Sequence, residues 1–234
     1  MIIIVGASKG LGKSIANVFK DRELLLISRS NIETNDPKHI SINLDINNFN
    51  YDDIKIKIED KKIEAIFFTA GVSKIKDNFG LTDNEKEEIF NTNYLSIVKI
   101  NEFFINNFKF KDSALICFCS SVTTLLPRGK QVLYCSAKKA LDSYFDSLRH
   151  FIALKNINIR LVNLALGFMD TEMNKDIKTL FPKKNPDKIA LYLRNNLKKI
   201  NGKYYLPKYW ILIKIVLSFI PFQIKLKIFN RYGV

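Results

Sequence analysis

The alternation of short apolar runs with helix-like segments is the feature that most constrains the fold of this 234-residue chain. The chain opens on Met1-Ile2-Ile3-Ile4-Val5, an apolar run that is rich in β-branched residues and ends at a glycine. Such a run is typical of a strand buried on both faces of a parallel sheet. Helical patterns separate most of the runs, so the order predicts an α/β fold with a doubly wound parallel sheet and right-handed crossovers. The other strand-like runs lie at residues 24–28, 39–44, 65–69, 114–119, 157–164 and 203–206.

The domain organisation follows from the same pattern and from the chain length. The sequence Asn185-Pro186-Asp187 marks the start of the last predicted helix, because Asn caps helices and proline suits the first turn. No repeat or low-complexity linker interrupts the pattern, and a chain of this length ordinarily forms one core. We therefore predict a single domain over residues 1–206, followed by a tail over residues 207–234. Helices are predicted at about residues 13–20, 51–60, 83–92, 94–107, 131–154 and 186–199.

A glycine-rich loop links the first predicted strand to the first predicted helix. Its sequence is Gly6-Ala7-Ser8-Lys9-Gly10-Leu11-Gly12. At this position a dinucleotide pyrophosphate needs a tight turn, a close approach of the backbone and the free N–H groups of a helix N-terminus. The loop therefore predicts a dinucleotide site. The expected contacts are Gly6, Ser8, Lys9, Gly10, Leu11 and Gly12.

The end of the second strand indicates which dinucleotide is bound. A carboxylate there would accept the adenosine ribose hydroxyls and repel a 2′-phosphate. The sequence Ile27-Ser28-Arg29-Ser30 contains no acid, and Lys9 supplies a second cation from the glycine loop. Both cations can form charge-assisted hydrogen bonds with a phosphate, so we predict NADP(H) as the cofactor. NAD(H) is the alternative, with Arg29 as a solvated loop residue.

A tyrosine, a lysine and one of two adjacent serines belong to the predicted catalytic group. Tyr134 and Lys138 stand four residues apart in a predicted helix, so their side chains share one face. The pKa of a free tyrosine is about 10. We expect the Lys138 ammonium to lower the pKa of Tyr134 toward useful acid–base chemistry. Ser120 and Ser121 follow the apolar run 114–119, at the carboxyl edge where sheets of this type bind ligands.

Together these residues resemble the short-chain dehydrogenase/reductase family, from Met1 to about Leu206. The resemblance implies a Rossmann-type fold, and the glycine spacing G-x-x-x-G-x-G is the one this family uses. The family's spacing between serine and tyrosine selects Ser121 over Ser120, since Ser121 lies thirteen residues before Tyr134. Asn93 matches the family asparagine that lies at a break in a helix and helps to hold a water, with Asn91 as the competing residue.

The same resemblance implies further cofactor contacts. Asp45, followed by Ile46, corresponds to the family residue that contacts the adenine amino group. Thr69-Ala70-Gly71 stands where the family usually has Asn-Ala-Gly, and Leu166-Gly167 stands where it has Pro-Gly. Thr171 occupies the place whose hydroxyl contacts the nicotinamide amide or phosphate. The contacts implied in this way are Asp45, Ile46, Ala70, Gly71, Tyr134, Lys138, Gly167 and Thr171.

The function implied by the resemblance is hydride transfer between a nicotinamide and a carbonyl or secondary alcohol, without a metal. Ser121 would polarise the carbonyl, Tyr134 would move its proton, Lys138 would tune Tyr134 and Asn93 would support a water chain. Alternative substrates are nucleotide-sugar, polysaccharide or lipid-linked envelope precursors. A non-catalytic NADP(H)-binding sensor is a second alternative, although such relatives typically lose the tyrosine or the lysine. Relatives commonly form homodimers or homotetramers through the helices that flank the Ser121 strand.

Residues 168–184 are expected to form a lid over the substrate. Apolar side chains in this segment suggest an apolar or bulky substrate, namely Phe168, Met169, Met173, Leu180 and Phe181.

Positive charge is concentrated at the C-terminal end of the chain. The formal net charge is +14, and after Asp187 there are ten Lys or Arg residues and no Asp or Glu. The apolar run 210–222 contains Lys214 and Pro221 and is too short to span a bilayer core of about 30 Å. Basic apolar segments of this kind can lie in the headgroup region of an anionic membrane, which we predict for residues 207–234. The alternative is packing on the protein or between subunits, and we expect no nucleic-acid partner.

The cysteines and the N-terminus indicate the compartment. Cys117, Cys119 and Cys135 are odd in number and lack metal-ligand spacing, so we expect reduced thiols in the interior. The start of the chain has no basic lead and no small-residue cleavage site, which argues against a signal peptide. We therefore predict a cytoplasmic protein, with the tail at the cytoplasmic face of a membrane.

Overall fold

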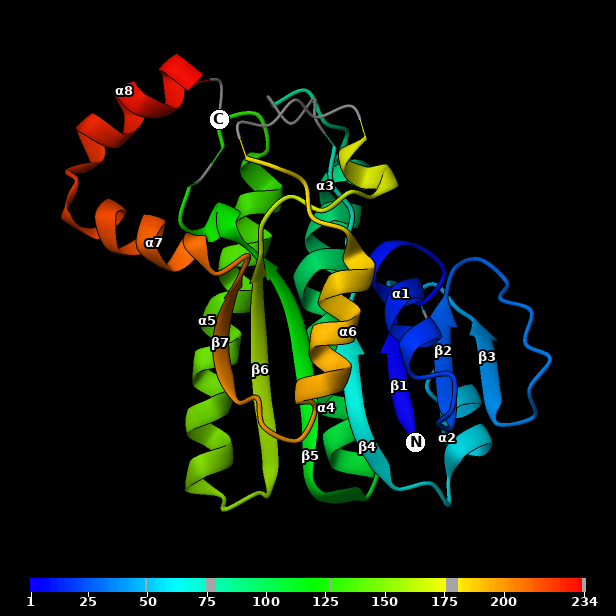
Figure 1. Cartoon of the computed structure of the whole chain (residues 1–234). Coiled ribbons are helices and arrows are strands. Elements are labelled where there is room, and N and C mark those ends of the chain that lie inside the picture. The colour runs from blue at the N-terminus through cyan, green and yellow to red at the C-terminus, as the bar shows by residue number, and fades with distance from the viewer. Residues whose placement is uncertain (49, 75–78, 127, 176–180, 233–234) are drawn as a thin grey trace.

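The computed structural model describes residues 1–48, 50–74, 79–126, 128–175 and 181–232, with side chains described as far as Lys227. Within these residues a seven-stranded sheet has the order β3-β2-β1-β4-β5-β6-β7, and every neighbouring pair is parallel. This arrangement confirms the predicted doubly wound sheet (Figure 1). The strands are β1 Ile2–Val5, β2 Leu24–Ser28, β3 His39–Asn43, β4 Ile63–Phe68, β5 Phe110–Ser121, β6 Ile159–Leu166 and β7 Gly202–Leu206.

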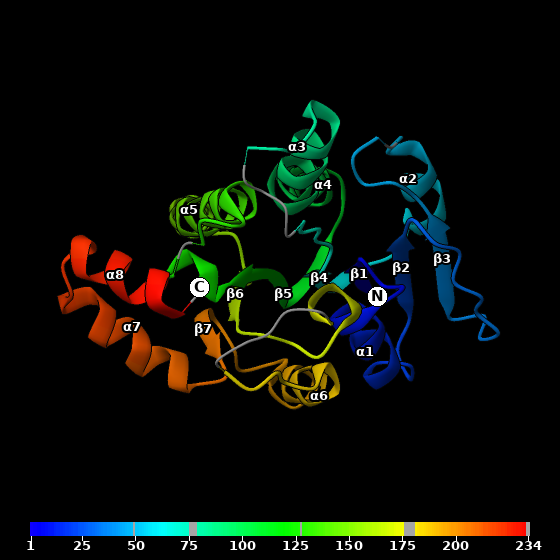
Figure 2. The same ribbon diagram turned by 90° about the horizontal axis from the view of Figure 1, so that it is seen from above.

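Helices cover both faces of the sheet. Seen from above, α1 and α6 lie on one side, and α2, α3, α4 and α5 lie on the other (Figure 2). The sheet therefore separates two apolar cores, which explains why its central strands are apolar on both faces. The helix bounds are α1 Gly10–Val18, α2 Asp52–Ile58, α3 Asp83–Phe90, α4 Ser96–Asn107, α5 Val132–Leu154 and α6 Pro186–Asn196.

Residues of β1 alternate between the two cores. Ile3 and Val5 join the core beneath α4 and α5, whereas Ile2 and Ile4 join the core beneath α1 and α6. All four side chains have 0% exposure. Burial on both faces leaves no position for a polar residue, which is why β1 reads as a continuous apolar run.

Two local signals in the sequence have the predicted structural effect, and one boundary differs. The Asn185 side chain caps α6 by accepting a hydrogen bond from the Asp187 N–H, and Pro186 takes the first helical position. The two helices predicted at 83–92 and 94–107 form one continuous helical run, because a π-helical turn, η1 Asn91–Leu95, joins α3 to α4. An insertion of this type keeps the helix unbroken while locally changing its hydrogen bonds.

The tail forms two helices, α7 Tyr209–Phe219 and α8 Phe222–Tyr232, beyond the β7 edge of the sheet (Figures 1 and 2). Its first turn packs on the domain, because Trp210 is 1% exposed and joins a small core with Val122, Ala165 and Tyr205. Several apolar side chains of the following turns remain exposed. Among the described helices, none combines the length and the hydrophobicity needed to span a bilayer.

Cys117, Cys119 and Cys135 are buried, as the sequence predicts, and within the described residues none of them forms a disulfide.

Candidate active site

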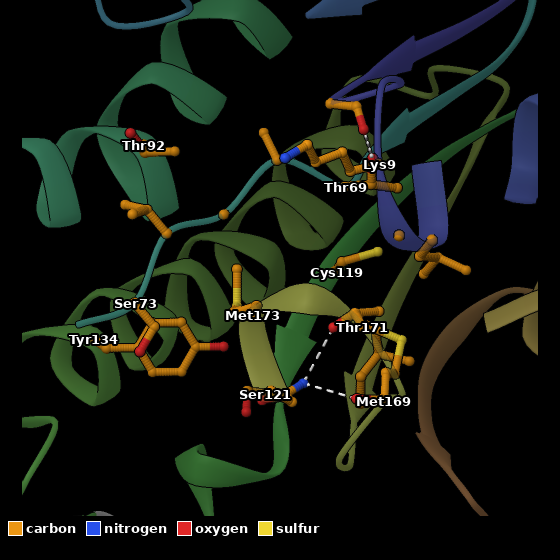
Figure 3. Close-up of a pocket in the computed structure, with 18 of the residues that line it drawn as sticks. Lys9, Thr69, Ser73, Thr92, Cys119, Ser121, Tyr134, Met169, Thr171 and Met173 are labelled. Atoms are coloured by element: carbon orange, nitrogen blue, oxygen red, sulfur yellow. Dashed lines mark hydrogen bonds between the residues drawn. The ribbon is translucent and has the colours of Figure 1, made fainter. Parts of the chain in front are cut away.

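A cavity of about 570 Å³ opens at the carboxyl ends of the central strands. It runs from the glycine loop after β1 to the start of α5, and Figure 3 shows Lys9 and Thr69 at one end and Ser73 and Tyr134 at the other. Most of the predicted site residues therefore share one cavity; the exceptions are Gly12 and Asn93, which lie behind its wall. The predicted residues that line it are Gly6, Ser8, Lys9, Gly10, Leu11, Arg29, Asp45, Ile46, Ala70, Gly71, Ser121, Tyr134, Lys138, Gly167 and Thr171.

The glycines of the first loop are required by close backbone packing. Gly6 has a φ of +95°, and a Cβ there would lie 2.5 Å from the Ala70 backbone nitrogen. A Cβ on Gly12 would lie 2.0 Å from the Gly6 carbonyl oxygen. The loop is thus pressed against the end of β4 and turns directly into α1, which leaves the free N–H groups of the helix start facing the cavity. This cradle fits a dinucleotide pyrophosphate.

Thr69 performs the structural task expected of a hydroxyl at the end of β4. Its Oγ1 donates to the Val5 carbonyl at 2.9 Å and lies 3.2 Å from the Gly6 carbonyl. Asp45 accepts a hydrogen bond from the Asn47 N–H at 2.9 Å, which orders the turn after β3. Both residues therefore shape the loops that border the cavity.

The two cations predicted to contact a 2′-phosphate each face a carboxylate. The Lys9 Nζ lies 2.7 Å from Glu172, across the cavity mouth, and the Arg29 Nη1 lies 3.1 Å from Glu88 on α3. The sequence carried no signal for either acid, because both are distant in the chain. Exposed ion pairs of this kind contribute little free energy, so neither carboxylate withholds its cation from a phosphate.

Tyr134, Ser121 and Lys138 line the cavity at the end where α5 begins. Tyr134 and Ser121 lie close enough for the Ser121 side chain to act on the phenol, where it favours a lower pKa. The Lys138 Nζ lies 5.8 Å from the centroid of the Tyr134 ring and donates to the Cys119 carbonyl at 2.9 Å. Ser121 is positioned by the Thr123 N–H, which donates to its Oγ at 3.2 Å. A phenol, a hydroxyl and an ammonium thus meet at one wall.

Burial sets the protonation of Tyr134 and Lys138. It raises the pKa of Tyr134 to about 12, although the Ser121 side chain acts in the opposite direction. It also lowers the pKa of Lys138 to about 8. The predicted lowering of the Tyr134 pKa is therefore wrong for this structure, because loss of hydration raises that pKa and the Lys138 ammonium is directed at the Cys119 carbonyl. Tyr134 keeps its proton at neutral pH, as a proton donor must.

Ser120, the neighbour of Ser121, is engaged elsewhere. Its hydroxyl donates to Asp142 at 3.1 Å, and the Asn163 amide donates to the same carboxylate oxygen at 2.7 Å. Lys203 forms an ion pair with the other oxygen. Asp142 lies two turns after Tyr134 on α5, so this buried carboxylate attaches the helix that carries Tyr134 to β5, β6 and β7.

Asn93 lies in the π-helical turn and is fully buried. Its Nδ2 donates to the carbonyls of Val72, at 2.7 Å, and Ile89, at 2.8 Å. A Cβ on Gly71 would lie 3.1 Å from the Asn93 Oδ1, so the two residues pack closely. Asn93 therefore supports the loop after β4, whereas the competing Asn91 is partly exposed.

The predicted lid contributes to the cavity in part. Phe168, Met169 and Met173 line it. Phe181 instead stacks on Tyr209, with ring centroids 5.9 Å apart, and packs against Trp210. Leu180 lies outside the described residues. The tail therefore covers one of the aromatic residues that the sequence analysis assigned to the substrate.

A polar chain near the start of α5 was not predicted from the sequence. Arg128 donates to the Gln131 Oε1 at 2.9 Å, and the Gln131 Nε2 donates to the Ser73 Oγ at 2.7 Å. The Arg128 guanidinium carbon lies 4.4 Å from the centroid of the Phe168 ring. All four residues line the cavity. The one available signal was the position of Arg128 and Gln131 in the connection between Ser121 and Tyr134.

Sequence comparisons agree with this geometry. A family model described as short chain dehydrogenase matches residues 1–180. The 3-oxoacyl-(acyl-carrier-protein) reductase FabG of Escherichia coli (strain K12) is 26% identical over 185 residues, which cover 74% of this chain and 75% of that protein. A dehydrogenase/reductase SDR family protein 7-like of Drosophila melanogaster is 24% identical over 197 residues, which cover 76% of this chain and 60% of that protein.

Solved structures share the fold. A short chain dehydrogenase family protein from Francisella tularensis subsp. tularensis SCHU S4 has a TM-score of 0.76 at 18% identity, covering 90% of this chain and 98% of that one. A short chain dehydrogenase from Burkholderia cenocepacia J2315, in complex with NADP, has a TM-score of 0.76 at 17% identity, covering 100% and 97%. A 3-ketoacyl-(acyl-carrier-protein) reductase from Brucella melitensis, complexed with NADH, has a TM-score of 0.74 at 16% identity, covering 88% and 95%.

Proposed function

Because this chain belongs to the short-chain dehydrogenase/reductase family, we propose that it is an NADP(H)-dependent oxidoreductase acting on a carbonyl or a secondary alcohol. The observation that carries the proposal is the convergence of Tyr134, Ser121 and Lys138 on the cavity that the glycine loop borders. A pyrophosphate cradle and a proton donor in one cavity suit hydride transfer coupled to proton transfer.

Each residue of the site has a role in the reductive direction. Bound NADPH would supply the hydride. Ser121 polarises the carbonyl oxygen through a hydrogen bond, and Tyr134, protonated at neutral pH, donates a proton to that oxygen. Lys138 holds ribose hydroxyls and returns a proton to Tyr134. Asn93 supports this return through the loop after β4 and a water that it helps to hold.

The cofactor is held along the rest of the cavity. The glycine loop would receive the pyrophosphate, Asp45 and Ile46 would border the adenine, and Thr171 would face the nicotinamide; these three residues and most of the loop line the cavity. Arg29 and Lys9 receive the 2′-phosphate, and their exchange of an exposed carboxylate for a phosphate costs little. These contacts favour NADP(H) over NAD(H).

The test is turnover of NADPH and NADH with a panel of ketones, aldehydes, keto-sugars and a 3-oxoacyl thioester, followed at 340 nm. We expect kcat/KM to be about tenfold or more higher with NADPH, and Arg29→Ala to remove most of that preference because it removes a phosphate contact. Lys13→Ala, which deletes an exposed lysine of α1 outside the cavity, should leave it unchanged. A preference for NADH contradicts the cofactor assignment. NADPH binding without turnover across the whole panel favours the non-catalytic sensor instead.

We also propose that the protein forms a homodimer or homotetramer through α4 and α5. The end of α5 leaves Phe151 47% and Leu154 68% exposed, and apolar groups of this size are commonly covered in oligomers.

The tail is proposed to lie on an anionic membrane surface. Apolar side chains of α7 and α8 are exposed, with Leu212 at 67% and Phe219 at 82%. Lys208, Lys214 and Lys227 are exposed in the same segment, where the sequence has no acid. This combination of apolar and basic groups matches the headgroup region of an anionic bilayer at the cytoplasmic face.

Liposome co-sedimentation tests the tail. Leu212→Glu combined with Phe219→Glu should reduce binding to phosphatidylglycerol vesicles roughly tenfold or more, because each buried apolar side chain contributes about 1.5–3 kcal/mol. Point changes are preferable to deletion of residues 207–234, since deletion removes the buried Trp210. Ile56→Glu combined with Phe79→Glu, which alters two exposed apolar residues elsewhere, is the matched control.

Unchanged vesicle binding by the tail variant contradicts the membrane assignment. Sedimentation velocity on the same proteins separates the alternatives. If the tail joins subunits, the tail variant dissociates, whereas an oligomer built on α4 and α5 keeps its sedimentation coefficient. A monomeric wild type contradicts the proposed oligomer.

A further inference from the structure

Arg128 is the cationic residue of the cavity whose charge the proposed mechanism does not use. Lys9 and Arg29 face carboxylates, and Lys138 donates to the Cys119 carbonyl beside Tyr134. In the described part of the chain, Arg128 has no carboxylate within ion-pair distance. It is partly buried, and burial lowers its pKa from the ordinary value of an arginine. Removing a guanidinium from water costs free energy when no negative charge is paired with it. An anionic ligand would supply that negative charge.

The guanidinium is held in place by its neighbours. The Nη1 donates to Gln131 at 2.9 Å, Gln131 is in turn fixed by Ser73, and the Phe168 ring supports the guanidinium at 4.4 Å. A guanidinium carries five N–H donors in a rigid plane, and Gln131 accepts from one nitrogen. Among the described residues no further hydrogen-bond acceptor is found for the Arg128 guanidinium. The remaining donors are therefore available to a ligand in the cavity.

The position of Arg128 distinguishes it from the cofactor contacts. Its partner Gln131 binds Ser73, which Figure 3 shows beside Tyr134 and away from Lys9 in the glycine loop. The charge of Arg128 also reaches Tyr134, because the guanidinium acts to lower the pKa of that phenol. The group that Arg128 faces is thus the substrate rather than the pyrophosphate.

We propose that Arg128 binds an anionic group, a carboxylate or a phosphate, of the carbonyl substrate, and so makes this enzyme selective for anionic carbonyl compounds. The proposal rests on the proposed function, since it names the substrate class of the same site. A planar guanidinium can bind either anion through two parallel hydrogen bonds, which fixes orientation as well as charge. The net charge of +14 also favours the approach of an anion.

The experiment compares anionic and neutral members of matched substrate pairs, with saturating NADPH. Dihydroxyacetone phosphate against dihydroxyacetone tests the phosphate, and acetoacetate against methyl acetoacetate tests the carboxylate. We expect wild-type kcat/KM to be about 10- to 100-fold higher for the anionic member of at least one pair, the range that one charge-assisted contact supplies. Arg128→Met should bring this ratio close to one by lowering turnover of the anionic member alone. Arg128→Lys keeps the positive charge but loses the planar guanidinium, so it should retain part of the preference for the anionic member.

Two controls keep the outcomes separate. Lys130→Met removes an exposed cation two residues away and should leave the ratio unchanged. Thermal stabilisation of the NADPH-saturated protein by dihydroxyacetone phosphate gives a second readout without catalysis, and it should be lost in Arg128→Met. The proposal is overturned if Arg128→Met lowers turnover of both members equally, or if it leaves the ratio and the stabilisation as in the wild type. Stabilisation that depends on Arg128 in a wild type without turnover would support the anion site and count against the proposed function.

Discussion

Replacing Tyr134 by Phe is expected to lower kcat by about 10²- to 10⁴-fold, the range that general acid–base catalysis supplies, and to leave the affinity for NADPH nearly unchanged. The substitution removes the hydroxyl that would donate the proton and keeps the ring that lies beside Lys138. The two effects should separate because the glycine loop, the proposed pyrophosphate site, lies at the opposite end of the cavity, where Figure 3 shows Lys9 away from Tyr134.

The measurement is single-turnover oxidation of NADPH at 340 nm, combined with a fluorescence titration of NADPH binding. Tyr144→Phe is the matched control, because Tyr144 lies on the same helix, is partly buried and binds Asn101 at 2.9 Å away from the cavity. Tyr144→Phe should lower the free energy of unfolding slightly and leave the rate of turnover unchanged. Normal turnover by the Tyr134 variant would refute the mechanism.

Gly12→Ala is expected to weaken NADP(H) binding by about 10- to 100-fold and to destabilise the fold by about 1–3 kcal/mol. The added methyl would lie 2.0 Å from the Gly6 carbonyl oxygen and 2.6 Å from the Thr69 Oγ1. Moving either atom would cost free energy. The Gly6 carbonyl belongs to the backbone, and the Thr69 hydroxyl is held by hydrogen bonds to the Val5 and Gly6 carbonyls. The start of α1 would have to move away from β4, and the pyrophosphate cradle would open with it.

Fluorescence titration with NADPH and thermal unfolding measure the two parts of this prediction. Gly80→Ala is the control, because a Cβ there would meet nothing within 4 Å and Gly80 has no positive φ. It should bind NADPH as the wild type does. If Gly12→Ala bound the cofactor with wild-type affinity, the glycine loop would not be the pyrophosphate site.

The order of strands and helices could be predicted from the sequence because both depend on local periodicity and on burial. The β1 run is apolar at every position since it faces two cores, and the four-residue spacing of Tyr134 and Lys138 places them on one face of any helix. The glycine loop could be located for a similar reason, as only glycine tolerates such close backbone contact. Helix boundaries were less certain, and the π-helical turn around Asn93 joined two predicted helices into one.

Other properties depend on which distant residues the fold brings together. Glu172 and Glu88 pair with Lys9 and Arg29, Trp210 packs on Phe181, and Arg128 lines the cavity without a carboxylate partner among the described residues. The pKa of Tyr134 also depends on the tertiary structure, because it is set by how far the phenol is removed from water and not by the four-residue spacing to Lys138. Short-range spacing and hydrophobic periodicity thus determined the fold class and the positions of the reactive groups. The protonation states, interaction partners and exposure of those groups were decided by the tertiary structure. Electrostatic free energies depend on burial and on distances through space, which local sequence does not contain.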